Sequence, residues 1–199
     1  MQRGRHLIPW FVVFCGVGLL LSFASAAPPN IVFIFSDDHA LRALGAYNSG
    51  LNQTPHIDRI AREGVLFARS YCGNSICCPS RATILTGKHS HKNGVLRNGS
   101  QWNSDQFVFS RALSEAGYRT ALFGKWHLRG WPTDEFDEWQ VLEGAGGQGH
   151  YYNPEFLCSD GRQRQVEGYS TDIITDVSID WMNKQSQQKQ PFLLMCQYK

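Results

Sequence analysis

Apolar residues along residues 30–199 occur in two arrangements, as short clusters and at helical spacing. Residues 30–35 form a continuous apolar run, which is typical of a strand buried on both faces of a sheet. Residues 118–123 and 191–196 are also predicted to be strands, and the second of these is of the buried type. Three other segments carry apolar residues at helical spacing, and these are residues 54–64, 107–116 and 170–183. Because strands and helices alternate, we expect an α/β fold with a mostly parallel sheet sandwiched by helices.

The intervening segments predict further details. Residues 65–67 are apolar and predict a short strand. Pro79 suits the first turn of a helix, so residues 80–85 are expected to form a short helix that ends at Gly87. Residues 128–168 are rich in glycine, aromatic residues and charge, and we expect a long excursion there. Its stretch 144–149 is interpreted as a flexible loop, because a nucleotide-binding glycine motif would follow a strand.

The N-terminus differs in composition from the rest of the chain. Arg3 and Arg5 precede an apolar run at 7–23, and Ala-Ser-Ala at 24–26 is a cleavage pattern. This predicts a secretory signal peptide over residues 1–26, and hence an exported protein, periplasmic or secreted, or lysosomal or extracellular in a eukaryote. An uncleaved membrane anchor is the alternative. The prolines that follow directly favour cleavage, so no stable membrane anchor is expected.

Length, charge and cysteine content bound the remaining possibilities. The chain has 199 residues, enough for one domain, and its net charge of +2 without a basic block gives no reason to expect a nucleic acid partner. Five cysteines follow the predicted leader, and their spacing does not select a disulfide pairing. A buried type of strand so near residue 199 predicts that residues 27–199 are the N-terminal part of a larger domain. The exposed sheet would then favour aggregation.

Polar side chains follow the predicted strands at one edge of the sheet. Asp37 and Asp38 come after the first strand, and the segment 125–127 follows the second. Ligands of open α/β sheets bind at the carboxyl ends of the strands. Adjacent carboxylates repel unless a cation joins them, and oxygen ligands of this kind suit Ca²⁺ or Mg²⁺. A solvated turn or a helix cap is the alternative interpretation of this pair.

Cys77 is the candidate reactive residue. It is placed at the N-terminus of the predicted short helix, beside unpaired N–H groups, with Arg81 one turn away, and such a position favours anions such as sulfate or phosphate. A zinc site is not supported by the cysteine spacing. A cysteine-phosphatase loop would need an arginine six residues after the cysteine, where Thr83 stands. A buried pair of small apolar residues, Cys77 and Cys78, is the remaining alternative.

The same segment carries a family motif. The run Cys77-x-Pro-Ser-Arg81, followed by Leu-Thr-Gly-Lys at 85–88, resembles the signature of the sulfatase family, within the alkaline phosphatase-like superfamily. The resemblance implies that a maturation enzyme oxidises Cys77 to formylglycine. It also implies that Asp37, Asp38 and the modified residue 77 bind Ca²⁺, with Mg²⁺ possible, and that the catalytic residues are Cys77, Arg81, Lys125 and His127. Lys125 and His127 are two residues apart, so on an extended segment they would point to the same side.

The resemblance also implies a mechanism. A hydroxyl of the hydrated aldehyde attacks the sulfur, a covalent sulfo-enzyme forms, and the second hydroxyl collapses to release sulfate. The metal ion would lower the pKa of the attacking hydroxyl. Arg81, Lys125 and His127 would stabilise the charge on the sulfate oxygens. Because the family's further metal and sulfate ligands lie in sequence with no counterpart here, we expect the isolated chain to be poorly active or inactive.

The expected substrate is a sulfated carbohydrate or another aryl or alkyl sulfate ester. Residues 86–95 and 197–199 look most like glycan-directed sulfatases, such as N-acetylglucosamine-6-sulfatases. A phosphonate monoester or phosphodiester hydrolase of the same superfamily is one alternative. A non-catalytic product of a truncated reading frame is the other.

Overall fold

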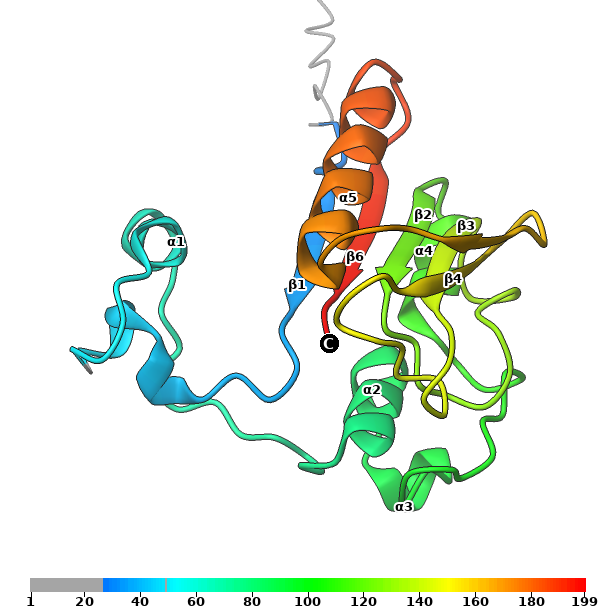
Figure 1. The fold of residues 1–199 in the computed structure, drawn as a ribbon, viewed down its shortest axis with the longest axis horizontal. Helices are drawn as coiled ribbons and strands as arrows, with labels where there is room; N and C mark the ends of the chain where they lie inside the picture. Colours follow the sequence, from blue (N-terminus) through cyan, green and yellow to red (C-terminus); the bar gives the residue numbers. More distant parts are fainter. Residues whose placement is uncertain (1–26, 49) are drawn as a thin grey trace, which may run out of the picture.

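The structure is a computed structural model, and it describes residues 27–48 and 50–199. The predicted leader at 1–26 lies outside the described residues. A six-stranded sheet with the order β1-β6-β2-β3-β4-β5 forms the centre (Figure 1). Its strands are β1 (Ile31–Phe35), β2 (Arg119–Gly124), β3 (Glu138–Leu142), β4 (Glu155–Cys158), β5 (Gln163–Gln165) and β6 (Phe192–Gln197).

Parallel and antiparallel pairings divide this sheet into two parts. β6 pairs in parallel with β1 and with β2, and β3 pairs in parallel with β2. β4 and β5 are added as antiparallel strands at the far edge. The predicted α/β class is therefore confirmed. The excursion at 128–168 differs from expectation because it contributes β3, β4 and β5 to the sheet.

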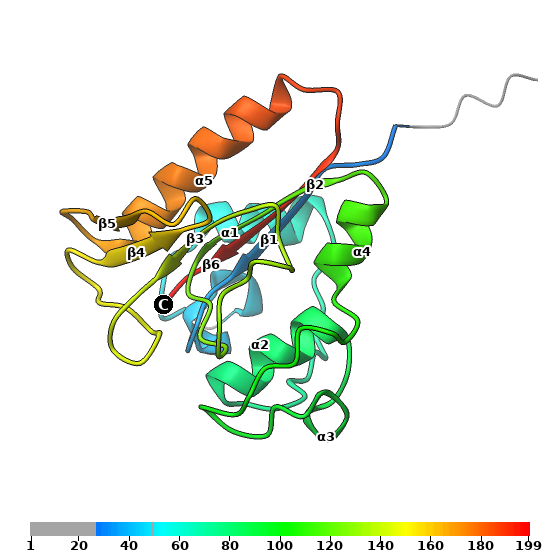
Figure 2. The ribbon, with the colours of Figure 1, turned by 90° about the vertical axis from the view of Figure 1, so that its right-hand side faces the viewer.

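Helices cover both faces of the sheet. Figure 2 shows α5 on one face, with α2 and α4 on the other. The helices are α1 (Pro55–Glu63), α2 (Cys77–Thr86), α3 (Ser90–Asn93), α4 (Phe109–Glu115) and α5 (Ser170–Ser186), with 3₁₀ turns η1 (Leu41–Ala43) and η2 (Gly45–Tyr47). None of the described helices combines the length and apolar character needed to cross a membrane.

The burial of strand β6 explains why its sequence is apolar from Phe192 to Cys196. Leu193 and Met195 belong to the core on the side of α2 and α4. Leu194 and Cys196 belong to the core on the side of α5. All six residues of β6 are buried, because successive side chains of a strand point to opposite faces and both faces are covered. The prediction of a strand buried on both sides is confirmed here.

Strand β1 departs from that prediction. Ile31 and Phe33 pack against the core on the side of α2, but Val32 and Ile34 are 43% and 60% exposed. Val32 is the register partner of the fully buried Leu194 on β6, so α5 covers this face at β6 and leaves it open one strand further. The expectation that this first strand is buried on both faces is therefore wrong for the described chain.

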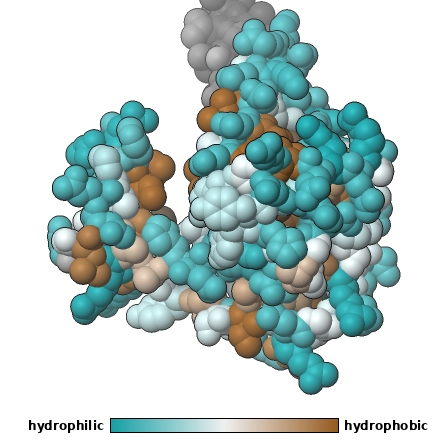
Figure 3. Space-filling view, viewed as in Figure 1, coloured by the Kyte–Doolittle hydropathy of each residue, from teal (hydrophilic) through white to brown (hydrophobic). Residues whose placement is uncertain are grey.

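Residues 41–71, which carry η1, η2 and α1, form an arm that stands away from the sheet (Figure 1). None of the described residues of the arm is buried. Pro55 opens α1 as predicted, and Asp58 links the helix to η2 by accepting hydrogen bonds from the Thr54 hydroxyl and the Ala46 amide, each at 2.7 Å. Residues 65–67 form no strand, so that prediction is wrong. Figure 3 shows apolar side chains on the surface of the arm; the exposed ones include Leu41, Leu51, Ile57, Ile60, Val65, Phe67 and Tyr71.

Candidate active site

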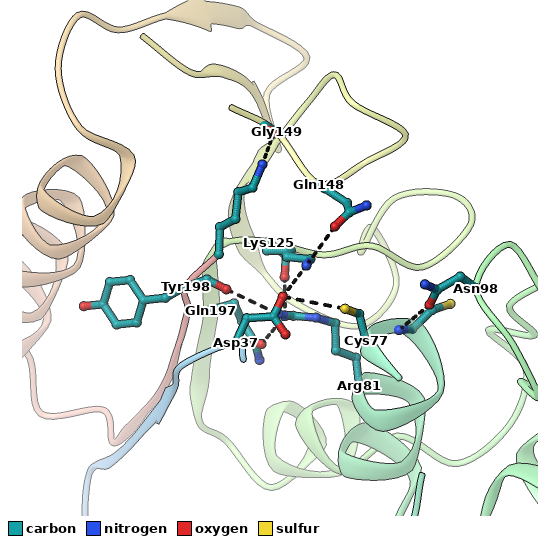
Figure 4. A network of polar contacts seen from close by, with 11 residues as sticks. Asp37, Cys77, Arg81, Asn98, Lys125, Gln148, Gly149, Gln197 and Tyr198 are labelled. Carbon is teal, nitrogen blue, oxygen red and sulfur yellow. Dashed lines mark hydrogen bonds and ion pairs between the residues drawn. The ribbon is translucent and has the colours of Figure 1, made fainter. Parts of the chain in front are cut away.

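The carboxyl end of the sheet brings three separate segments together. Asp37 follows β1, Arg81 lies on α2 and Lys125 follows β2 (Figure 4). The Lys125 ammonium pairs with Asp37 Oδ2, and Arg81 Nη2 lies 3.7 Å from the same oxygen. Cys77 Sγ lies 3.8 Å from that oxygen as well. One carboxylate oxygen thus faces a thiol and two cations that come from distant parts of the sequence.

Arg81 is a fixed cation beneath this site. Its side chain is 3% exposed and lies over the ring of Phe35, with the guanidinium carbon 5.1 Å from the ring centroid. Arg81 Nη1 donates to the carbonyl of Lys125 at 2.6 Å and to Gln197 Oε1 at 2.5 Å, and Nη2 donates to the carbonyl of Tyr198 at 3.3 Å. Burial lowers the pKa of Arg81 to about 10, opposed by the charge of Asp37, so the group stays protonated at neutral pH.

The approach of β2 to β6 places Lys125. Gly124 has φ +110°, and an added Cβ would lie 2.0 Å from the carbonyl oxygen of Gln197. Only glycine permits this contact without a shift of the backbone. The next amide, Lys125 N, donates to that carbonyl at 2.7 Å. The strand end is therefore held against β6, and Lys125, only 2% exposed, is directed at Asp37.

Cys77 is the first residue of α2, as the sequence predicts. It lines a cavity of about 350 Å³ together with Asp37, Asp38 and Ser80. The neighbouring Cys78 is buried, and burial raises the pKa of its thiol, which makes it a poor nucleophile. Cys77 is partly exposed at the helix N-terminus, where free amide groups favour an anionic group. The two adjacent cysteines therefore differ in access and environment.

The described thiols form no disulfide bonds with one another. The cysteines at positions 72, 77, 78, 158 and 196 are all free thiols, so none of the disulfide pairings that the sequence left open is formed among them. Cys196 and Cys158 are buried within the core, and burial raises the pKa of both thiols.

The two aspartates differ in environment although they are adjacent. The Asp37 side chain is 11% exposed, whereas Asp38 is exposed and has φ +49°. Burial alone would raise the pKa of Asp37. The hydrogen bond from Lys125 and the charge of Arg81 outweigh that effect and lower the pKa below its ordinary value. Asp37 is therefore an anion held by cations, and Asp38 is an exposed side chain that lines the same cavity.

The donor set can be compared with the needs of a divalent cation. Asp37, Asp38 and residue 77 line one cavity, and carboxylate oxygens are the donors that Ca²⁺ and Mg²⁺ prefer. Two carboxylates supply only part of the six to eight oxygens of a calcium site. Within the described ranges, no cluster of three or more His, Cys, Asp or Glu side chains is close enough to hold a metal ion. The residues present therefore fit part of such a site.

His127 takes a different position from the one expected. Its φ of +56° breaks the extended segment, so the simple alternation expected for Lys125 and His127 does not apply. Burial lowers the pKa of His127, and the charge of Lys125 adds to this effect. Its Nδ1 is buried without a hydrogen-bond partner among the described residues. His127 is not among the residues that line the Cys77 cavity; it lies instead near Gly147, whose added Cβ would be 4.0 Å from the imidazole Cδ2.

Several residues of the site were missed by the sequence reasoning. Gln197 accepts from Arg81, and its place at the end of a buried strand was a usable signal. Asn98 accepts a hydrogen bond from the amide of Cys78 at 3.1 Å. Gln148, inside the stretch interpreted as a flexible loop, accepts from Lys125 Nζ at 3.3 Å. Lys199 Nζ donates to the carbonyl of Gly149 at 2.5 Å, which joins that loop to the end of β6 (Figure 4).

Comparisons with known proteins agree with this geometry. The family model described as Sulfatase matches residues 29–199. An N-acetylglucosamine-6-O-sulfatase of Bacteroides thetaiotaomicron is 47% identical over 171 residues, which cover 86% of this chain and 30% of that protein. An ulvan-active sulfatase of Formosa agariphila is 32% identical, with 83% of this chain and 34% of that protein covered. The chain thus spans about a third of the length of these curated relatives.

Solved structures show the same relationship. A protein solved in complex with its substrate D-glucosamine-2-N,6-O-disulfate superposes with a TM-score of 0.81 at 46% identity, covering 85% of this chain and 34% of the other. A phosphonate monoester hydrolase of Agrobacterium radiobacter superposes with a TM-score of 0.63 at 20% identity, which shows a shared fold only. The match to the family model over residues 29–199, with the alkaline phosphatase-like arrangement of sheet and helices, shows that this chain belongs to the sulfatase family.

Proposed function

We propose that the protein containing this chain hydrolyses sulfate esters, with Cys77 converted to formylglycine as the source of the nucleophile. The observation that carries the proposal is the convergence of Cys77, Arg81 and Lys125 on Asp37 at the carboxyl end of the sheet. A sulfate ester that binds beside Asp37 and residue 77 would lie near two buried cations. Such fixed charges stabilise the charge that develops as the ester bond breaks.

Each described residue has a task in this proposal. The modified residue 77 carries the attacking hydroxyl at the free N-terminus of α2. Lys125 donates a proton or a hydrogen bond toward a sulfate oxygen, and Arg81 holds the ends of β2 and β6 in place. Asp37 and Asp38 would hold a divalent cation, which would lower the pKa of the attacking hydroxyl and neutralise sulfate charge. His127, whose pKa is lowered by burial, would contact the leaving oxygen.

We infer that the substrate is a sulfated carbohydrate, with glucosamine 6-sulfate as the preferred unit. The support comes from the relative at 47% identity, whose name specifies N-acetylglucosamine 6-O-sulfate, and from the 46% identical structure with a disulfated glucosamine bound. A phosphonate monoester or phosphodiester substrate is less supported, because that neighbour shares the fold at only 20% identity. Export to the periplasm or outside the cell, and a formylglycine-generating partner enzyme, complete the proposal.

The proposal is tested with a chimera. Residues 29–199 of this chain replace the matching region of the 47% identical relative, which supplies the remaining two-thirds of the protein. The chimera is expressed with a formylglycine-generating enzyme, and the mass of the peptide holding residue 77 is measured. We expect an aldehyde at position 77 and sulfate release from N-acetylglucosamine 6-sulfate that is faster than hydrolysis of a matched phosphodiester. A thiol at position 77 in an active chimera, or preference for the phosphodiester, would overturn the proposal.

A further inference from the structure

Three exposed tyrosines form a cluster at the carboxyl edge of the sheet. The tyrosine cluster consists of Tyr151 and Tyr152, which precede β4, and Tyr169, which precedes α5. The ring centroids of Tyr151 and Tyr169 are 6.5 Å apart with the planes 25° from parallel, and those of Tyr152 and Tyr169 are 5.2 Å apart. Tyr152 is 70% exposed, Tyr151 49% and Tyr169 37%. The rings contact one another, but they remain open enough to solvent to contact a ligand as well.

The backbone holds these rings in place. Tyr152 and Tyr169 form an isolated antiparallel bridge. Ser170 N donates to the carbonyl of Tyr151 at 2.7 Å, and Asn153 N donates to the carbonyl of Gly168 at 2.8 Å. The two segments that carry the tyrosines are therefore tied to each other and to the start of α5. A surface fixed in this way loses little conformational entropy when it binds a ligand.

A chain of contacts connects the cluster to the candidate active site. Lys199 Nζ lies 4.4 Å from the ring centroid of Tyr151 and donates to the carbonyl of Gly149. The residue before Gly149 is Gln148, whose Oε1 accepts from Lys125 in the active site. The tyrosine cluster is thus linked through Lys199 and residues 148–149 to Lys125, and Lys199 adds a positive charge beside the cluster.

We propose that the tyrosine cluster and Lys199 form a second sugar subsite, which binds the sugar next to the one that is desulfated. The proposal rests on the proposed glycan substrate. Sugar rings carry C–H groups with partial positive charge on their faces, and these suit the negative face of a tyrosine ring. The ammonium of Lys199 complements a sulfate or carboxylate on that sugar. Tyrosine hydroxyls at the edges of the rings add hydrogen bonds to sugar hydroxyls.

Binding is measured by calorimetric titration of the purified chain, which does not depend on turnover. The two probes are N-acetylglucosamine 6-sulfate and a sulfated tetrasaccharide that ends in the same residue. We expect the tetrasaccharide to bind at least about fivefold more tightly than the monosaccharide. Tyr152→Ala should remove this difference, and Tyr152→Phe, which keeps the ring, should retain most of it. Because Tyr152 is largely exposed, the alanine variant should fold normally.

Matched controls separate the possible results. Tyr71→Ala removes a tyrosine that is 89% exposed on the arm and lies outside the cluster, and it should leave both affinities unchanged. Lys199→Met should weaken the binding of the sulfated tetrasaccharide and leave the affinity for its desulfated form unchanged. Equal affinities of the wild-type chain for the two probes, no binding of either, or an unchanged preference in Tyr152→Ala would overturn the subsite. A chimera that desulfates nothing while the Tyr152-dependent preference persists would refute the proposed function and leave the subsite standing.

Discussion

Arg81 Nη1 and Gln197 Oε1 lie 2.5 Å apart, and this bond connects the helix that begins at Cys77 to the end of β6, which lies between β1 and β2 in the sheet. The same nitrogen donates to the carbonyl of Lys125 at the end of β2. One buried guanidinium thus fixes α2, β2 and β6 relative to one another. Its positive charge also balances Asp37, so the group that organises the backbone of the site contributes to its electrostatics.

Replacing Arg81 by lysine should destabilise the protein. Lysine keeps a positive charge but cannot reach three acceptors with a planar fork, so Gln197 Oε1 and a buried carbonyl lose their donors. We expect Arg81→Lys to lower the free energy of unfolding by about 3 kcal/mol, measured by urea denaturation. Arg59→Lys is the control, because Arg59 is 62% exposed in its pair with Glu63, and it should change stability by less than about 0.5 kcal/mol. Equal effects in the two variants would contradict the assigned role of Arg81.

The close contact of Gly124 with Gln197 leads to a second prediction. Gly124→Ala places a methyl group 2.0 Å from a backbone oxygen and also forces alanine to φ +110°. Gly130→Ala is the matched control, because Gly130 has φ +86° but nothing within 4 Å of an added Cβ. The control should cost about 1–2 kcal/mol of unfolding free energy from backbone strain alone. Gly124→Ala should lower the free energy of unfolding by at least about 2 kcal/mol more than the control does. Thermal unfolding measurements that give the same loss for both variants would show that β2 is not held against β6 by this contact.

Asp37 should make stability depend on pH in the acid range. Its pKa in the folded chain is lowered from 3.8, so its ion pairs contribute stability above the unfolded pKa, and this contribution is lost as pH falls through the folded pKa. Asp37→Asn should therefore be less stable than the wild type near pH 7, and the difference should shrink below about pH 4. Unfolding free energies measured by denaturant titration across this range would test it. A stability difference that stays constant down to pH 2 would show that the charge of Asp37 is not responsible.

Strands β1, β2 and β6 could be predicted because they are rich in apolar residues, and the helices between them because their apolar residues recur at helical spacing. The runs at 118–123 and 191–196 became β2 and β6 with a shift of one residue. Strands β3 to β5 were missed because they lie within the segment 128–168, whose glycine, aromatic and charged residues give no clear strand pattern, and β5 is the wholly polar Gln163–Gln165. No local pattern reports which strands a neighbouring helix covers, so the open face of β1 could not be foreseen.

The site was foreseen in its composition more fully than in its contacts. Asp37, Cys77, Arg81 and Lys125 were all named from a motif and from their places after strands, and the structure brings them together. The contact of Gln148 with Lys125 spans 23 residues and depends on a loop conformation with several positive φ angles. The bond of Lys199 to Gly149 spans 50 residues. Contacts of this range are set by the packing of strands, which sequence periodicity does not encode.

The exposed face of β1 predicts self-association. Val32→Thr combined with Ile34→Thr should reduce light scattering of the concentrated protein and change the unfolding free energy by less than about 1 kcal/mol, because both side chains are exposed. Leu194→Thr is the control, since Leu194 is the register partner of Val32 but is fully buried. It should lower stability by at least about 2 kcal/mol. Undiminished scattering in the double variant would indicate that another surface drives association.

Residue 77, and not its neighbour Cys78, is proposed to provide the nucleophile. The most direct test is the initial rate of sulfate release from N-acetylglucosamine 6-sulfate by the matured chimera, compared between Cys77→Ala and Cys78→Ala. We expect Cys77→Ala to lower the rate by at least about 10³-fold, and Cys78→Ala, which alters only a buried thiol, to keep it within about tenfold of the unsubstituted chimera. Retention of the rate in Cys77→Ala, or its loss in Cys78→Ala alone, would contradict the account.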